Sequence, residues 1–185
     1  MGSSLFFLAV GFRKPHLPFN APRKYWDLYK RNNIPMPENA RHPKEAPELA
    51  TRSWMELEGY TDVPKNGKLS DSKIRELRHG YYSCVSYIDA QNWAINECFG
   101  RKRTKEKTVV MIYGDHGFHL GEQGLWTKAN NFELSTRVPL IFSLPNYSGA
   151  QSNALVELVD VYPSLCDAVE LPIPRKLEGT SFFQS

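Results

Sequence analysis

The chain has 185 residues, with 23 Lys and Arg against 20 Asp and Glu, a formal net charge of +3. This length is enough to bury the core of one domain, and so balanced a charge does not indicate a nucleic-acid-binding protein. Residues 101–107 form a local basic run without interleaved aromatic or glycine residues. We interpret it as a solvated connection and expect no nucleic-acid partner.

Two further classes of protein find no support in the sequence. The apolar residues 5–10 are too few for a membrane span or a secretory signal, so no membrane span is expected. The three cysteines, Cys84, Cys98 and Cys166, are far apart and odd in number, so they indicate no disulfide framework and no particular compartment.

The first third of the chain predicts one strand, one short helix and a long loop. Residues 4–10 are predicted to form a buried strand, and Pro15 and Pro18 stiffen the loop that follows, which places His16 at a strand end. A short helix is expected over residues 23–30. Residues 34–68 contain five prolines and little periodicity, which predicts a surface excursion; long loops of this kind are often functional.

The remainder reads as helix, strand, strand, helix. Residues 70–99 are predicted to form one long amphipathic helix capped by Ser70 or Asp71, because apolar residues recur there at a spacing of three or four. The stripe consists of Ile74, Leu77, Tyr81, Val85, Ile88, Ile95 and Phe99. Strands are predicted at 109–113 and 138–144, and a helix from Asp160 as N-cap with Pro163 in its first turn. This order indicates an α/β fold, taken as one domain over residues 1–185.

The most informative stretch is residues 108–117, an apolar run that ends in Gly114 and then presents Asp115 and His116. A continuous apolar strand suits a parallel sheet covered on both faces, and ligands of such sheets collect beyond the carboxyl ends of the strands. The alternative is a solvated turn with an N-cap aspartate. From residue types alone, the pair would suit zinc or iron as readily as calcium.

Four blocks of the sequence together resemble the sulfatase family of the alkaline-phosphatase superfamily, especially its iduronate-2-sulfatase type. They are residues 6–19, 87–91, 115–128 continued by 136–142, and 155–163, in the family's order. The resemblance implies a partial alkaline-phosphatase-like α/β fold, with a mixed, mostly parallel sheet flanked by helices. It also implies a lysosomal or secreted location in a eukaryote, and a periplasmic or secreted one in a bacterium.

The family's nucleophile is a formylglycine made from the cysteine of a Cys-x-Pro/Ala-x-Arg motif, and Cys84, Cys98 and Cys166 all lack this context. The family's paired amino-terminal metal-binding aspartates have no counterpart either. The 185 residues therefore resemble an internal-to-carboxyl part of a sulfatase, with no catalytic nucleophile of their own, and we expect them to be inactive alone.

The resemblance also implies the ligands of a calcium ion and of the sulfate. Asp115 and His116 are the expected calcium ligands, with the remaining ligands supplied by the missing amino-terminal part. His16 and Lys128 are the expected sulfate contacts. The glycines between Asp115 and Lys128 let the backbone fold back toward the anion. The alternatives are a surface lysine and a loop histidine stacked on proline.

Three neighbouring side chains have less direct roles. Phe118 is predicted to form a wall of the substrate pocket, His119 to hydrogen-bond within its loop, and Trp126 to be buried in packing. The function implied is removal of sulfate from uronate-containing glycans, so the expected partner is a sulfated glycan. Two alternatives remain open: a phosphoester or phosphonate hydrolase of the same superfamily, and a non-catalytic protein that binds sulfated glycans.

Overall fold

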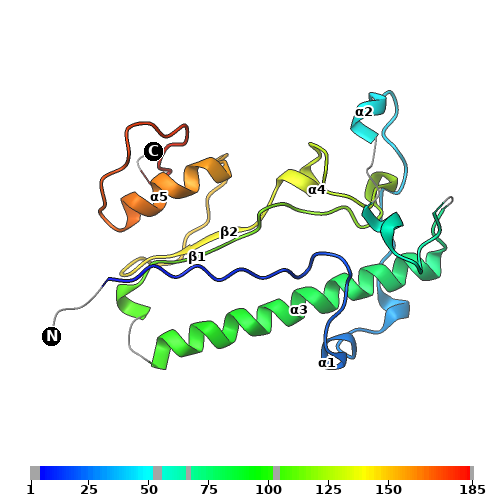
Figure 1. Cartoon of the computed structure of the whole chain (residues 1–185), viewed down its shortest axis with the longest axis horizontal. Helices are drawn as coiled ribbons and strands as arrows, with labels where there is room; N and C mark the ends of the chain where they lie inside the picture. Colours follow the sequence, from blue (N-terminus) through cyan, green and yellow to red (C-terminus); the bar gives the residue numbers. More distant parts are fainter. Residues whose placement is uncertain (1–4, 52–55, 66–67, 102–104, 184–185) are drawn as a thin grey trace. The chain divides into compact units, whose positions relative to one another are not determined.

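The computed structural model of the chain describes residues 5–51, 56–65, 68–101 and 105–183. The chain divides into two compact units, residues 1–96 with 118–131, and residues 97–117 with 132–185. Among the described residues, no helix is both long and apolar enough to cross a membrane. The frame is α/β, built around one long helix and one small sheet (Figure 1).

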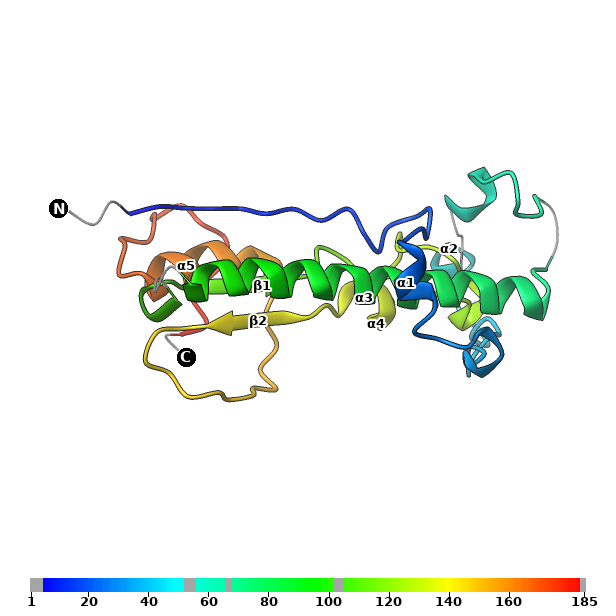
Figure 2. The ribbon, with the colours of Figure 1, turned by 90° about the horizontal axis from the view of Figure 1, so that it is seen from below.

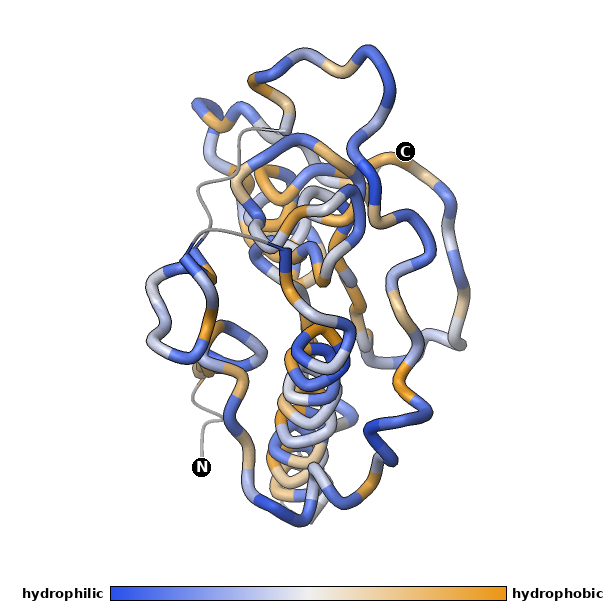
Figure 3. The backbone as a smooth tube through the Cα atoms, turned by 90° about the vertical axis from the view of Figure 1, so that its right-hand side faces the viewer, coloured by the Kyte–Doolittle hydropathy of each residue, from blue (hydrophilic) through white to orange (hydrophobic). Residues whose placement is uncertain are grey.

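The longest element is α3, Asp71–Arg101, which confirms the predicted helix to within two residues at each end. Ser70 caps it: its Oγ accepts the Lys73 N–H at 3.2 Å and its carbonyl accepts the Ile74 N–H at 2.9 Å. Asp71 adds a negative charge to the first turn, where the helix dipole favours it. Polar and apolar residues mix along the helix (Figure 3).

The buried face of α3 differs in part from the predicted stripe. Ile74, Leu77 and Tyr81 do pack against the core, but Val85 is 45% exposed. A close contact is made at Gly80, where an added Cβ atom would lie 2.8 Å from the Phe19 Cβ. Small residues let the preceding segment lie directly on the helix, a contact that apolar periodicity does not report.

The core of the first unit is small and draws on three separate parts of the chain. Its central cluster consists of the buried side chains Leu17, Leu57, Val63, Leu120 and Trp126. Each such side chain contributes about 1.5–3 kcal/mol through the apolar area it buries. The burial of Trp126 confirms its predicted packing role. Leu57 and Val63 show that residues 34–68 are not only a surface excursion, because they supply two core residues.

The loops of the first unit contain several short helices. α1 covers Arg23–Trp26, four residues where eight were predicted, and a 3-10 turn follows at Arg31–Asn33. α2 (Glu48–Thr51) and the 3-10 helix η2 (Glu56–Gly59) interrupt the otherwise irregular proline-rich segment. The predicted strand at residues 4–10 is wrong for its described part: residues 5–10 pair with no described strand, and Leu5 and Phe7 are 96% and 86% exposed.

The second unit contains the only sheet formed by the described residues, a pair of strands (Figures 1 and 2). β1 (Val110–Tyr113) pairs with β2 (Leu140–Ser143), both within the predicted ranges. The pairing is antiparallel, whereas mostly parallel strands were expected. The reason lies at Gly114, whose N–H donates to the Pro139 carbonyl at 3.1 Å: the chain leaves β1 and enters β2 at the same end.

The last helix, α5 (Val161–Ala168), follows a 3-10 turn at Leu158–Asp160, with Pro163 in its first turn as predicted. Asp160 is at the N-cap position but does not cap α5 with its side chain. Its carboxylate accepts the N–H groups of Glu157 and Thr180, both at 2.9 Å, which lowers the pKa of Asp160. Asp160 thus ties the C-terminal segment to the helix start.

Candidate functional site

His16, Glu56 and Lys128 form a polar cluster in the first unit, although 112 residues separate the first from the last. The Lys128 Nζ lies 2.8 Å from the His16 Nε2 and 3.1 Å from the Glu56 Oε2. The other oxygen, Glu56 Oε1, lies 3.1 Å from the same His16 nitrogen. The structure therefore brings together the two residues that the family resemblance assigned to sulfate, and adds a carboxylate that contacts both.

Each member of the cluster is adjacent in sequence to a buried residue, which fixes the position of its backbone. Leu17 follows His16, Leu57 follows Glu56 and Thr127 precedes Lys128, and all three are no more than 2% exposed. The polar side chains themselves are 26–32% exposed, so their tips reach solvent. Rigid neighbours with accessible polar tips are what a preorganised binding site needs.

The loop that carries His16 is held by its own side chains. The His16 Nδ1–H donates to the Leu17 carbonyl at 2.8 Å, which sets the ring so that Nε2 points to Lys128 and Glu56. The Lys14 ammonium donates to the His16 and Pro18 carbonyls across the turn. Burial lowers the pKa of Lys14.

The loop that carries Lys128 is held to α3 by an ion pair between the buried Arg78 and the partly buried Glu122. The Arg78 Nη1 lies 2.7 Å from the Glu122 Oε1 and also donates to the Leu120 carbonyl at 3.0 Å. The Glu122 Oε2 accepts the Leu120 N–H at 2.7 Å. Burial alone would raise the pKa of Glu122, but the hydrogen bonds from Arg78 and the backbone outweigh it and hold that pKa below its usual range.

Two residues of this loop have interior contacts. His119 is fully buried: its Nδ1 lies 3.2 Å from the Glu122 carbonyl, and its Nε2 3.3 Å from the Asn130 Oδ1. This agrees with the expected hydrogen bonding within the loop. Phe118 packs edge-on against Phe19, with ring centroids 5.9 Å apart. That contact gives Phe118 a packing role, and its role as a substrate wall stays a prediction.

Asp115 and His116 follow β1 in the second unit. The Asp115 Oδ1 accepts the His116 N–H at 3.1 Å, and the side chain of Asp115 is 82% exposed. The His116 Nδ1–H donates to the Gly117 carbonyl at 2.8 Å, so in the neutral ring the lone pair is on Nε2. This Nε2 lies 3.8 Å from the Asp115 Oδ2, a separation compatible with two ligands of one cation, each about 2.0–2.6 Å from it.

The pair fits part of a divalent-cation site. In metal sites, the other ring nitrogen of a ligating histidine often donates to a backbone carbonyl, which fixes the tautomer, as the Gly117 carbonyl does for His116. Among the described residues, however, no group of three or more His, Cys, Asp and Glu side chains could hold a metal. Calcium takes about six to eight oxygen ligands, so Asp115 and His116 would supply a minority of them.

Gly117 presses the loop after β1 closely against α4, Glu133–Thr136. Its N–H donates to the Ser135 carbonyl at 2.8 Å, and a Cβ at this position would lie 2.0 Å from the Leu134 carbonyl oxygen. A backbone atom cannot move aside as a flexible side chain can. Gly117 therefore fixes the backbone next to Asp115 and His116.

We expect Gly117→Ala to lower the free energy of unfolding by about 1–3 kcal/mol, because the added methyl group overpacks this contact. Gly149→Ala is the matched control in the same unit, since a Cβ there meets nothing within 4 Å. The control should change stability by less than about 1 kcal/mol. Urea unfolding of both variants checks this, and equal effects would show that the Gly117 contact is not tight.

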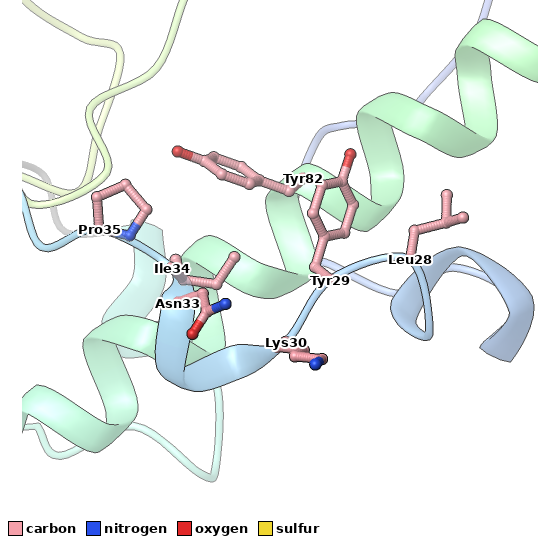
Figure 4. Close-up of a pocket in the computed structure, with 7 residues that line it drawn as sticks. All are labelled: Leu28, Tyr29, Lys30, Asn33, Ile34, Pro35 and Tyr82. Atoms are coloured by element: carbon pink, nitrogen blue, oxygen red, sulfur yellow. The ribbon is translucent and has the colours of Figure 1, made fainter.

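A separate hollow of about 410 Å³ opens beside α3 in the first unit. Figure 4 shows the rings of Tyr29 and Tyr82 side by side within it. It is lined by Leu28, Tyr29, Lys30, Asn33, Ile34, Pro35 and Tyr82. None of these residues belongs to the His16–Glu56–Lys128 cluster, and the Tyr29 hydroxyl is hydrogen-bonded to the Ser86 Oγ at 2.6 Å.

The family resemblance named His16, Lys128, Asp115 and His116 as candidates, and neither it nor the local sequence patterns named Glu56. The only signal for Glu56 was its place in the proline-rich segment, which was expected to be functional, and a single glutamate there has no motif. A His–Lys pair that can hold an oxyanion, and an Asp–His pair suited to a divalent cation, are features of metal-dependent hydrolases of anionic esters.

Comparison with known proteins identifies the particular group. The chain belongs to the sulfatase family, because the family model described as Sulfatase matches residues 3–171. Its structural neighbours share the alkaline-phosphatase-like α/β fold of sulfatases, of which these residues form a part. The expected family and fold class are thereby confirmed.

Relatives include the iduronate 2-sulfatases of Mus musculus and Homo sapiens, each 31% identical over 97% of this chain. The choline-sulfatase of Rhizobium meliloti is 32% identical over 86% of the chain. A phosphonate monoester hydrolase from Silicibacter pomeroyi superposes with a TM-score of 0.79 and 25% identity, covering 91% of this chain and 35% of its own. The chain spans 38% of the length of the two iduronate 2-sulfatases and 30% of the choline-sulfatase.

Proposed function

We propose that the intact protein, in which these 185 residues are joined to the family's nucleophile, is a sulfuric ester hydrolase of the iduronate-2-sulfatase type. The observation that carries this is the contact between His16 and Lys128 at 2.8 Å. Two nitrogens with accessible tips meet at one point, the Lys128 ammonium as a donor and His16 Nε2 as a donor when protonated, which suits binding of an oxyanion. Membership of the sulfatase family makes the sulfate group the natural choice of oxyanion.

In this proposal, His16 and Lys128 bind and orient the sulfate group. Lys128 is a compact cation with three N–H donors, and His16 offers one N–H from Nε2 when this nitrogen is protonated. Charge develops on the sulfate oxygens and the leaving oxygen as the ester bond breaks. Fixed donors aimed at those oxygens stabilise the transition state more than the ground state.

Asp115 and His116 would hold a calcium ion, as the resemblance to sulfatases implies. A bound divalent ion polarises the ester group and offsets its charge. The Gly117 carbonyl accepts the Nδ1 proton of His116, which leaves Nε2 as the nitrogen that would ligate such an ion. Gly117 itself fixes the backbone through α4.

The substrate that we propose is a sulfate ester on a uronate-containing glycan. The support is the 31% identity with the two iduronate 2-sulfatases over 97% of the chain. The choline-sulfatase relative is similar in identity, so identity alone does not choose between sugar and small-molecule esters. The match to the iduronate 2-sulfatases includes more of the chain, 97% against 86%, and we therefore favour the glycan.

A second candidate is hydrolysis of phosphonate or phosphate esters, which the TM-score of 0.79 with a phosphonate monoester hydrolase favours. The test uses the intact protein with 4-nitrophenyl sulfate and 4-nitrophenyl phenylphosphonate, which release the same product. We expect a higher kcat/KM for the sulfate. A higher value for the phosphonate would favour the second candidate, and sulfated-glycan binding without turnover of either ester would identify a non-catalytic protein.

A further inference from the structure

Glu56 occupies the donors that the proposed function assigns to the sulfate. Its two carboxylate oxygens lie 3.1 Å from the His16 Nε2 and 3.1 Å from the Lys128 Nζ. A carboxylate and a sulfate group are both anionic acceptors with similar oxygen geometry at these donors. We propose that Glu56 is a positioning residue: without a bound anion, its carboxylate contacts both His16 and Lys128 where the sulfate would bind. When the anion binds, Glu56 releases its contact with His16. This inference rests on the proposed function.

His16 and Lys128 differ in the number of N–H groups they offer, and this difference decides which of them exchanges Glu56 for the sulfate. The His16 Nδ1 is committed to the Leu17 carbonyl at 2.8 Å, so the ring presents only Nε2, with at most one proton, to the cluster. Lys128 has three N–H groups and can serve Glu56 and an anion at once. A sulfate oxygen therefore replaces Glu56 at His16, while Lys128 keeps its contact with Glu56.

The resident carboxylate also explains how the cluster is stable without an anion. The Lys128 Nζ and His16 Nε2 are only 2.8 Å apart, and with both residues charged they would repel each other. Glu56 lies within 3.1 Å of both and compensates that charge. Because Leu57 is buried beside it, Glu56 stays near the site after it releases His16. It therefore competes with each anion that binds.

The test measures the dissociation constant of inorganic sulfate for four forms of the intact protein: wild type, Glu56→Gln, Glu58→Gln and Lys128→Ala. Glutamine keeps the shape of Glu56 but removes its charge, so sulfate should bind about tenfold more tightly, equivalent to about 1.4 kcal/mol. Glu58 lies in the same η2 helix, and its carboxylate ion-pairs with no residue that the structure describes. Glu58→Gln therefore controls for general charge removal and should bind sulfate as the wild type does.

The outcomes separate this inference from the proposed function. Sulfate binding by the wild type and its loss in Lys128→Ala uphold the anion site. Equal or weaker binding by Glu56→Gln would then overturn only the competition by Glu56. Failure of Glu56→Gln to fold would overturn it as well, because Glu56 would then be structural. If the wild type does not bind sulfate, or Lys128→Ala binds it equally well, the proposed anion site itself is wrong.

The same competition predicts that KM for ester hydrolysis changes while kcat does not. Glu56→Gln should lower KM by a factor similar to its effect on sulfate binding, with little change in kcat, because Glu56 competes before the chemical step. A purely structural role would raise KM or lower kcat. A fall in kcat without a fall in KM would contradict the assignment.

Discussion

Replacement of Lys128 by alanine is expected to reduce kcat/KM for a sulfate ester by about 10²–10³ in the intact protein, roughly 3–4 kcal/mol. The physical reason is the loss of a charge-assisted contact that strengthens as negative charge develops on the departing groups. Lys128→Arg should rescue activity incompletely, because a planar guanidinium does not replace a compact ammonium beside His16. Steady-state kinetics measures this effect.

Stability provides the control for this prediction. The Lys128–Glu56 pair is partly exposed, at 26% and 32%, so its loss should cost less than about 1 kcal/mol of folding free energy. Lys30→Ala, which removes an exposed lysine of the same unit, should leave kcat/KM unchanged. If Lys128→Ala retains the kcat/KM of the wild type, Lys128 is a surface residue and the assignment of the cluster to sulfate is wrong.

The largest effect on stability is expected at Glu122. Glu122→Gln leaves the Arg78 guanidinium, whose side chain is only 9% exposed, without its carboxylate. Leaving the buried Arg78 charge without its partner costs about 3 kcal/mol, and the melting temperature should fall by roughly 6–12 °C. The exposed pair Glu133–Arg137 is the matched control, with side chains 80% and 84% exposed, and Glu133→Gln should have almost no effect.

The same pair gives a pH dependence of defined sign. The folded-state pKa of Glu122 is held below its usual value of 4.5, so its stabilising effect is complete above that value and is lost as the pH falls through the folded pKa. Thermal unfolding between neutral pH and pH 3 should therefore show a smaller acid loss for Glu122→Gln than for the wild type. Parallel curves for the two proteins would rule out this role.

Local patterns predicted the elements better than their arrangement. The helix α3 has a sustained 3.6-residue period, which depends only on near neighbours in sequence, and its bounds were close to those predicted. The same pattern missed Arg78, because an arginine on a helix is usually solvated and its partner lies 44 residues away. Burial of that charge depends on a tertiary contact that no local pattern encodes.

The candidate site shows the same limit. His16 and Lys128 were paired through a family resemblance, not through spacing, and Glu56 had no such guide. The expected mixed, mostly parallel sheet left the direction of this particular pair open, because the apolar run at β1 reports burial but not the direction of its neighbour. The chain returns at Pro139 beside Gly114, and that return sets the antiparallel pairing with β2.

The most direct measurement is a crystal structure of the intact protein with a bound sulfate ester that is not turned over. We expect the sulfate oxygens to accept hydrogen bonds from the Lys128 Nζ and the His16 Nε2, with Glu56 moved off His16 but still paired with Lys128. A sulfate group bound away from His16 and Lys128, with Glu56 still bridging the two, would contradict the account.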